Sequence, residues 1–136
     1  MAPAETKGTP DSSSELNFMG AIEAHVRWKI RLEAYINGTS EEHLDPDVVC
    51  RDDQCALGKW IYGGGGAKYG NHPMFPVLKQ THMNFHRSAG DIIRAVDAGE
   101  TEKARTMLNS GEYARHSHRV KSDLARLSIE LESDFE

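Results

Sequence analysis

The sequence predicts an all-α protein, an up-and-down bundle of four long or medium helices plus one short helix that carries a cysteine. Three observations support this fold class. Apolar residues recur with the helical period of about 3.6 residues over long segments. No segment shows a convincing alternation of apolar and polar residues, which a half-buried strand would require. The 136 residues are enough for one hydrophobic core and too few for two comfortable ones.

Charge and composition exclude several classes of function. The chain has 16 basic and 21 acidic side chains, a net charge of −5, and no basic cluster that would follow the phosphates of a nucleic acid. No apolar run approaches the roughly 20 residues of a membrane span, and the first residues lack the apolar core of a secretory signal. We therefore expect a cytoplasmic protein that neither inserts into membranes nor binds nucleic acid. In a reducing cytosol, the two cysteines, Cys50 and Cys55, are more often metal ligands or redox groups than disulfide partners.

The N-terminal part predicts an arm followed by a long helix. Residues 1–13 contain proline, glycine and polar residues with almost nothing to bury, so we expect a disordered arm or linker, and residues 14–136 form the predicted helical domain. Ser12 and Glu15 have the spacing of a capping box, and the helix should end near Asn37-Gly38. His25 lies in its apolar stripe, where a histidine is more often a hydrogen-bonded core residue than a ligand. The stripe consists of Phe18, Ile22, Leu32 and Ile36, widened on one side by Met19, Val26 and Ile30.

The middle of the chain predicts an irregular connection and then a short helix. Residues 39–54 have little periodicity and should form at most one turn of helix. Residues 53–62 read as a short helix with Cys55 in its first turn, where exposed N–H groups and the helix dipole favour a thiolate. The glycine run 63–66 should end that helix, because consecutive glycines lose much conformational entropy in a helix.

The second half of the chain predicts three further helices. His72-Pro73 begins a long helix that reaches about Asp97, and its apolar stripe includes His82 and His86. Thr101 can cap a medium helix that is interrupted near Ser110-Gly111. The last helix covers about 112–133, and its stripe is Tyr113, His116, Val120, Leu124, Leu127 and Leu131.

Histidine and cysteine residues in these stripes indicate a metal site. His82 and His86 stand four residues apart, so both imidazoles project from one face of a helix, and Cys55 offers a third ligand. Zinc in a structural or sensing site normally takes four such ligands. For the fourth, residues on core stripes are the strongest candidates, namely His25 and His116. Residues in connections or off the stripes are weaker ones, namely Cys50, His43, His72 and His118.

Four motifs resemble the chemoreceptor zinc-binding (CZB) domain family. They are the stretch Cys-Ala-Leu-Gly-Lys-Trp-Ile-Tyr from Cys55, a His-x-x-Trp at His25, a Pro-x-Phe at Pro73, and the His-x-x-x-His of His82 and His86. They occur in the family's order, and the resemblance covers residues 15–135, whereas Cys50 and the four-glycine run lie outside the signature. The resemblance implies a zinc site made of His25, Cys55, His82 and His86, and it leaves His116 as a core or interface residue.

The resemblance also implies a function and a partner. CZB domains are regulatory modules of bacterial signalling proteins, chemoreceptors and diguanylate cyclases among them. They form homodimeric helical bundles and respond to zinc availability or to oxidants such as hypochlorous acid. Here Cys55 is the expected redox switch, because a zinc-bound thiolate is the oxidisable form of cysteine. The chain is expected to be a stand-alone CZB protein or a piece of a larger receptor or cyclase.

Three alternatives compete with this interpretation. A catalytic zinc site is not expected, because the segment from His82 to His86 lacks the glutamate of a His-Glu-x-x-His motif, and we predict no enzyme activity. A hemerythrin-like di-iron bundle that binds oxygen would need bridging carboxylates and has no place for a core thiol. The third alternative is a helical interaction module in which zinc is absent or only structural.

Overall fold

The computed structural model of the protein describes residues 16–134, and all regular structure in this range is helical. The long helices are α1 (Phe18–Asn37), α5 (Met74–Asp97) and α7 (Glu112–Asp134), and α6 (Thr101–Ser110) precedes α7. Three short helices lie between α1 and α5, namely α2 (Pro46–Val49), α3 (Ala56–Tyr62) and α4 (Gly64–Tyr69). The predicted all-α class is confirmed. The predicted arm, residues 1–13, and Ser12 itself lie outside the described residues, but α1 begins at Phe18 with Asn17 as its cap, so the predicted start of this helix at Ser12 is wrong.

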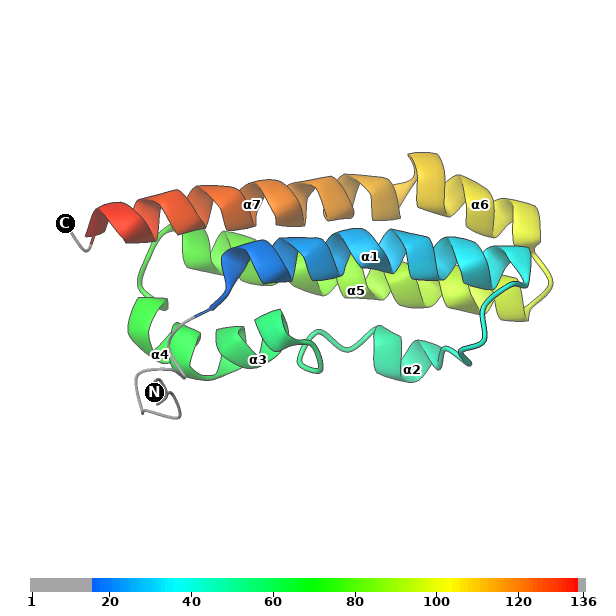
Figure 1. Ribbon diagram of the computed structural model, residues 1–136, viewed down its shortest axis with the longest axis horizontal. Coiled ribbons are helices and arrows are strands. Elements are labelled where there is room, and N and C mark those ends of the chain that lie inside the picture. Colours follow the sequence, from blue (N-terminus) through cyan, green and yellow to red (C-terminus); the bar gives the residue numbers. More distant parts are fainter. Residues whose placement is uncertain (1–15, 135–136) are drawn as a thin grey trace, which may run out of the picture.

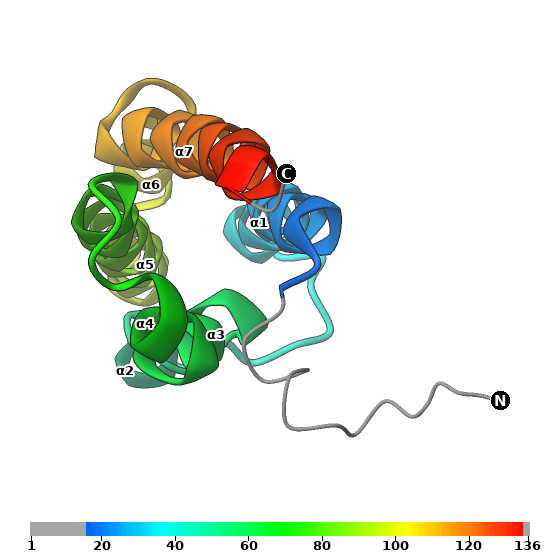
Figure 2. The same ribbon diagram turned by 90° about the vertical axis from the view of Figure 1, so that its left-hand side faces the viewer.

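The helices form an up-and-down bundle whose second member is broken into pieces. In Figure 1, α1 and α5 run in one direction, and α6 with α7 returns in the other. Between α1 and α5 the chain returns through α2, α3 and α4, which follow one another along one side of the long helices. The end view in Figure 2 shows these three short helices closing the side of the bundle between α1 and α5. We call α2, α3 and α4 with their connections the broken column.

Local signals explain the ends of the first long helix. The side chain of Asn17 accepts a hydrogen bond from the backbone N–H of Gly20 at 2.9 Å, which caps the N-terminus of α1. Gly38 ends the helix with φ at 74°, a left-handed conformation that glycine adopts without steric cost. The predicted end of this helix is therefore confirmed.

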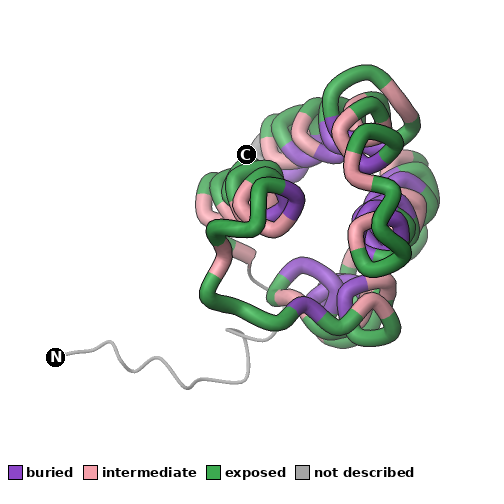
Figure 3. The backbone as a smooth tube through the Cα atoms, turned by 90° about the vertical axis from the view of Figure 1, so that its right-hand side faces the viewer, coloured by how far each residue is buried: buried purple, intermediate pink, exposed green. Residues whose placement is uncertain are grey.

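Buried residues lie on the inner sides of the helices in Figure 3, and most of them are apolar. On α1, however, the stripe is narrower than predicted. Met19, Val26 and Ile30 are 66%, 43% and 62% exposed, because no described helix of this chain covers that side of α1. The fully buried apolar side chains of the core come mainly from α1, α3, α5 and α7, and they include Leu32, Leu57, Leu78, Phe85, Ile92, Ile93, Leu124 and Leu127.

The glycine run is helical, contrary to the sequence-based expectation. α3 does stop at Gly63, but α4 begins at the next residue and contains the other three glycines of the run. A Cβ atom on Gly65 would lie 2.2 Å from the indole ring of Trp60, so this position needs glycine for packing. The tertiary contact outweighs the low helix propensity of glycine, which costs about 1 kcal/mol per residue. No helix among residues 16–134 is long and apolar enough to cross a membrane.

Candidate metal centre

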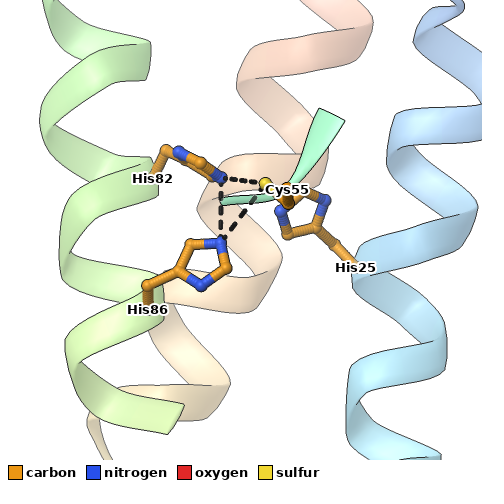
Figure 4. A group of neighbouring side chains, drawn as sticks. All are labelled: His25, Cys55, His82 and His86. Carbon is orange, nitrogen blue, oxygen red and sulfur yellow. Dashed lines mark hydrogen bonds between the residues drawn. The ribbon is translucent and has the colours of Figure 1, made fainter. Parts of the chain in front are cut away.

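Four side chains from three segments converge in the interior of the bundle. His25 comes from α1, Cys55 precedes α3, and His82 and His86 come from α5, as Figure 4 shows. One ligand atom of each residue lies within 4.8 Å of the corresponding atoms of the others. The cluster contains no carboxylate, and it is the only group of this kind among the described residues.

The two histidines of α5 face each other and the sulfur. The Nε2 atoms of His82 and His86 are 3.1 Å apart, and the Sγ atom of Cys55 is 3.3 Å from the first and 3.6 Å from the second. One helical turn separates the two residues, so regular α-helix geometry is sufficient to place both rings on the same side. These three atoms surround a common point.

His25 completes the cluster from the opposite helix. Its Nδ1–H donates to the carbonyl of Ala21 in the preceding turn at 2.7 Å, because a carbonyl can only accept. The lone pair is therefore on Nε2, which is buried and has no hydrogen-bond partner among the described residues. The ring of His25 is 5.2 Å from that of His82 and 5.9 Å from that of His86. A buried, unpartnered acceptor beside two other imidazoles indicates a site for a cation.

The broken column orients His86. Its Nδ1–H donates to the backbone carbonyl of Val49, the last residue of α2, at 3.0 Å, which leaves the lone pair of Nε2 directed at the cluster. α2 is in turn held on α5 by Arg94, which pairs with Asp47 at 3.0 Å. A Cβ atom on Gly90 would lie 2.8 Å from the Cβ of Cys50, so glycine at this position allows α2 to approach.

Cys55 caps α3 with its sulfur. The backbone N–H of Gly58 donates to Sγ at 3.4 Å, a contact that favours the thiolate. A Cβ atom on Gly58 would lie only 1.7 Å from the carbonyl oxygen of Asp52, so two backbone segments touch at this glycine. Tyr62, one α3 turn further, also donates its hydroxyl to Asp52 at 2.5 Å. These contacts fix the loop that carries Cys55.

Burial keeps the donor groups uncharged. It lowers the pKa of His25 to about 4 and that of His82 to about 2, with a further decrease from the other imidazoles, and it lowers the pKa of His86 as well. At neutral pH all three rings are neutral and have lone pairs to share. Burial also raises the pKa of Cys55 above its ordinary value, against the opposing effect of backbone N–H groups including that of Gly58.

The donor set and its spacing fit zinc. Zn–N distances of about 2.0–2.1 Å and a Zn–S distance of about 2.3 Å place tetrahedral ligand atoms about 3.3 Å (N to N) and about 3.5 Å (S to N) apart. The observed separations of 3.1, 3.3 and 3.6 Å agree with these values within a few tenths of an ångström. Three imidazoles and one thiolate are ligands that zinc accepts, and four of them leave no open position for a substrate. The identity of the ligands stays a prediction.

The other candidates for the fourth ligand lie outside the cluster. His116 is on α7, where its Nε2 is 3.2 Å from a carboxylate oxygen of Glu112. His72 is 3.3 Å from Glu130, and the thiol of Cys50 donates to the carbonyl of Asp47 at 3.4 Å. The remaining two candidates, His43 and His118, are exposed.

Two supporting features were not predicted from the sequence. The carbonyl of Val49 is a backbone group, and nothing in the sequence indicates that it faces a ring 37 residues further along the chain. The close approach at Gly90 has a sequence signal, because a glycine inside a helical pattern is costly and usually has a packing reason.

Comparison with known proteins is informative at the level of the family. Residues 25–93, slightly more than half of the chain, match the family described as Chemoreceptor zinc-binding domain. This segment contains all four residues of the cluster. Neither the curated proteins nor the solved structures gave a match to the chain.

Proposed function

Because the chain belongs to the chemoreceptor zinc-binding domain family, we propose that it is a regulatory zinc-binding module of bacterial signalling, of the chemotaxis or cyclic-di-GMP type. Its zinc ligands are Nε2 of His25, His82 and His86 and the thiolate of Cys55. The convergence of these four donor atoms within 4.8 Å is the observation that carries the proposal. The resemblance and this geometry agree on the same four residues.

The module is proposed to sense rather than to catalyse. A bound zinc ion holds the sulfur of a cysteine as thiolate at neutral pH. In this chain the three histidines are at most 3% exposed, whereas Cys55 is half-buried. Cys55 is therefore the ligand that a solvent-borne oxidant reaches most easily, and its departure would release the short helix α3.

The proposed trigger is the zinc level or oxidation of Cys55. Hypochlorous acid can transfer its oxygen to the thiolate, which forms sulfenic acid and releases chloride. Sulfenic acid is a weaker zinc ligand than thiolate. The three histidines stay in place on α1 and α5, so the predicted response is a movement of residues 53–66 relative to a fixed frame.

We also infer a homodimer. Met19, Val26 and Ile30 form an apolar stripe on α1 that is largely exposed in the single chain. An exposed stripe of this kind on a helix of a bundle is typical of an interface between subunits.

Zinc titration of the wild type and of Cys55→Ala tests the metal site. The protein is stripped of metal, and zinc binding is measured together with the thermal unfolding midpoint and the oligomeric state. We expect one zinc per chain, a rise of the midpoint on binding, and a large loss of affinity in the variant. Unchanged affinity in Cys55→Ala, or no zinc above background in freshly purified protein, would refute the ligand set.

Treatment with hypochlorous acid tests the trigger. We expect a mass increase at Cys55 and faster amide hydrogen exchange in residues 53–66, with α5 unchanged. If Cys55 keeps its mass and the exchange is unaltered, oxidation is not the trigger, and a response to the zinc level and an interaction module with a structural zinc are the two functions that remain. The closed four-ligand set is compatible with that second function.

A further inference from the structure

Cys50 is the one cysteine that the proposed function leaves without a role. The chain has two cysteines, and only Cys55 belongs to the metal centre. Cys50 follows the last residue of α2 and stands five residues before Cys55. Its thiol donates a hydrogen bond to the carbonyl of Asp47 at 3.4 Å, and its side chain is half-buried. A second nucleophilic sulfur therefore lies close in the sequence to the proposed redox switch.

The two cysteines lie on either side of one imidazole ring, that of His86. The carbonyl of Val49, the residue before Cys50, is 3.0 Å from Nδ1 of this ring, and Sγ of Cys55 is 3.6 Å from Nε2. The width of one ring and two polar contacts therefore separate that carbonyl from the sulfur of Cys55. Cys50 also touches α5, because a Cβ atom on Gly90 would lie 2.8 Å from its own Cβ. Cys50 is thus held beside the metal centre without belonging to it.

The connection between the two cysteines borders open space. Residues 51–54 contain no helix, and Arg51 and Gln54 are exposed. Both line a cleft of about 510 Å³, whose wall also includes Val49 and Cys55. The connection therefore has room to change its course without displacing the buried core.

Oxidation of Cys55 would loosen this connection. The sulfur accepts a hydrogen bond from the N–H of Gly58 and so caps α3, and a sulfur that leaves the histidines leaves this N–H as well. The contacts of Asp52 with Gly58 and Tyr62 join the connection to α3 and not to the long helices. They do not hold the sulfur at the histidines once it is oxidised.

The position of α2, in contrast, does not depend on the sulfur of the metal centre. Arg94 of α5 pairs with Asp47 at 3.0 Å, and the hydrogen bond between His86 and Val49 joins the same two helices. Cys50 therefore keeps its place on α5 while the oxidised sulfur becomes free to approach it.

We propose that Cys50 is the resolving thiol of Cys55, so that oxidation of Cys55 ends in a disulfide between the two residues. The sulfur of Cys50 attacks the sulfur of the sulfenic acid. The S–S bond forms, the S–O bond breaks, and the hydroxyl group leaves as water with the thiol proton of Cys50. The proposal deepens the proposed function and rests on it for the oxidant, hypochlorous acid. The pairing of the two thiols does not depend on zinc, so it can be tested separately.

The disulfide would make the response reversible. A sulfur in a disulfide is no thiolate, so Cys55 stays off the metal as long as the bond persists. The bond also protects Cys55 from further oxidation to sulfinic and sulfonic acids, which thiols do not reverse. A thiol reductant would restore both cysteines and with them the zinc site.

Disulfide exchange in the metal-free protein is the first test. One equivalent of dithiodipyridine forms a mixed disulfide at either cysteine, and attack by the other thiol expels the second thiopyridone, with the proton released to the solvent. We expect a chain that has lost two hydrogen atoms, at a rate independent of protein concentration. Trypsin cleaves after Arg51, between Cys50 and Cys55, so the pairing appears as two linked peptides. A persistent mixed disulfide, or a disulfide between chains, would overturn the proposal.

The same exchange in urea is the control, because cysteines five residues apart also meet in an unfolded chain. We expect the native rate to be no more than about threefold below the rate in urea, since loop closure is equally short in both. A larger deficit would mean that the fold holds the two sulfurs apart, and the proposal would then be wrong.

Reversal of oxidation in the zinc-loaded protein is the second test. Wild type and Cys50→Ser, which keeps a hydrogen-bond donor of similar size, are treated with hypochlorous acid and then with a thiol reductant. In the wild type, the mass increase at Cys55 should be that of the attached Cys50 peptide, and zinc binding should return. In the variant, Cys55 should reach sulfinic and sulfonic acid, and the recovered zinc binding should be at least about threefold lower.

Equal recovery in both proteins would overturn a resolving role of Cys50. If the wild type bound no zinc, the proposed function would fail, and the exchange in the metal-free protein would still decide whether the two cysteines pair.

Discussion

The metal centre joins two regions of very different construction. Three of the four proposed ligands come from α1 and α5, helices of 20 and 24 residues, and are at most 3% exposed. The fourth, Cys55, comes from the broken column, where α3 has seven residues and the side chain is half-buried. Three histidines on long helices thus form a rigid frame, and they face Cys55, which lies at the start of the short helix α3 in the broken column.

The two regions also differ in how far close contacts at glycines contribute to their positions. Packing of side chains such as Phe85, whose ring is 4.9 Å from that of His25, positions the histidines. The broken column also packs buried side chains such as Leu57 into the core, but in addition it depends on close contacts at two glycines, Gly58 against Asp52 within the column and Gly90 against Cys50 at the end of α2. A buried side-chain core tolerates small shifts poorly, whereas a backbone contact at one glycine can be removed by adding one methyl group. The comparison can therefore be tested with single substitutions.

Removal of a frame histidine should have the largest effect. His82→Ala deletes one of four ligands, and because a four-ligand zinc site is worth about 10–16 kcal/mol, we expect the affinity to fall about a hundredfold or more. Competition with a chromophoric chelator measures this loss. His118→Ala, which removes an exposed histidine of α7, is the control and should bind zinc like the wild type.

Displacement of the broken column should have the next largest effect. In Gly58→Ala the new Cβ collides with the carbonyl of Asp52, so the loop that carries Cys55 must move. We expect a loss of zinc affinity close to that of Cys55→Ala, about tenfold to a hundredfold, with little change of the far-UV circular dichroism. Lys59→Ala, an exposed neighbour on α3, is the control. Wild-type affinity in Gly58→Ala would show that the position of Cys55 does not depend on this contact.

Displacement of α2 alone should have a smaller effect. Gly90→Ala pushes α2 away from α5 and lengthens the hydrogen bond from His86 to Val49. Loss of such a bond to a ligand typically costs about tenfold to a hundredfold in affinity, and we expect the lower end because the ring stays packed. Alanine also favours the helix by about 1 kcal/mol over glycine, so a stable variant with weaker zinc binding is expected. Gln80→Ala on the same helix is the control, and equal affinities would contradict a role of α2.

The number of protons released when zinc binds should distinguish the histidines from Cys55, with the smallest expected effect on affinity. The lowered pKa values mean that His25 and His82 hold no extra proton at pH 7, whereas the raised pKa of Cys55 means that its thiol does. Binding should therefore release about one proton, all of it from Cys55, and the affinity should rise about tenfold per pH unit between pH values of about 7 and 8. Calorimetry in buffers of different ionisation enthalpy measures this number. Release of two or more protons would show that frame histidines are charged before zinc binds.

Much of the histidine frame could be predicted from the sequence, because in a regular helix the spacing of two residues in the sequence determines whether they lie on the same face. The stripe of α5 placed His82 and His86 together, and the end of α1 at Gly38 followed from its glycine. From the residues alone His25 and His116 remained equal candidates, since both lie on core stripes. The family resemblance favoured His25, and the structure brings His25 to the cluster.

The broken column could be predicted only in outline. Its short helix was expected, with Cys55 at the start, but α4 was not, because the contact of Gly65 with Trp60 depends on how the chain folds back on itself. The carbonyl of Val49 and the contact of Gly58 with Asp52 are backbone features as well, and they have no residue signature of their own. Tertiary contacts outweighed local propensity in this part of the chain.

The position of Cys55 in the chain has a consequence for the unfolded state. It stands 27 residues before His82 and 30 after His25. A metal bound to all four residues therefore closes two consecutive loops that both end at Cys55. Release of the sulfur merges both into one larger loop between the first and last histidines, and the entropy of the intervening chain increases, as when a cross-link is cut. A chemical change at one sulfur thereby increases the conformational freedom of the whole segment between α1 and α5.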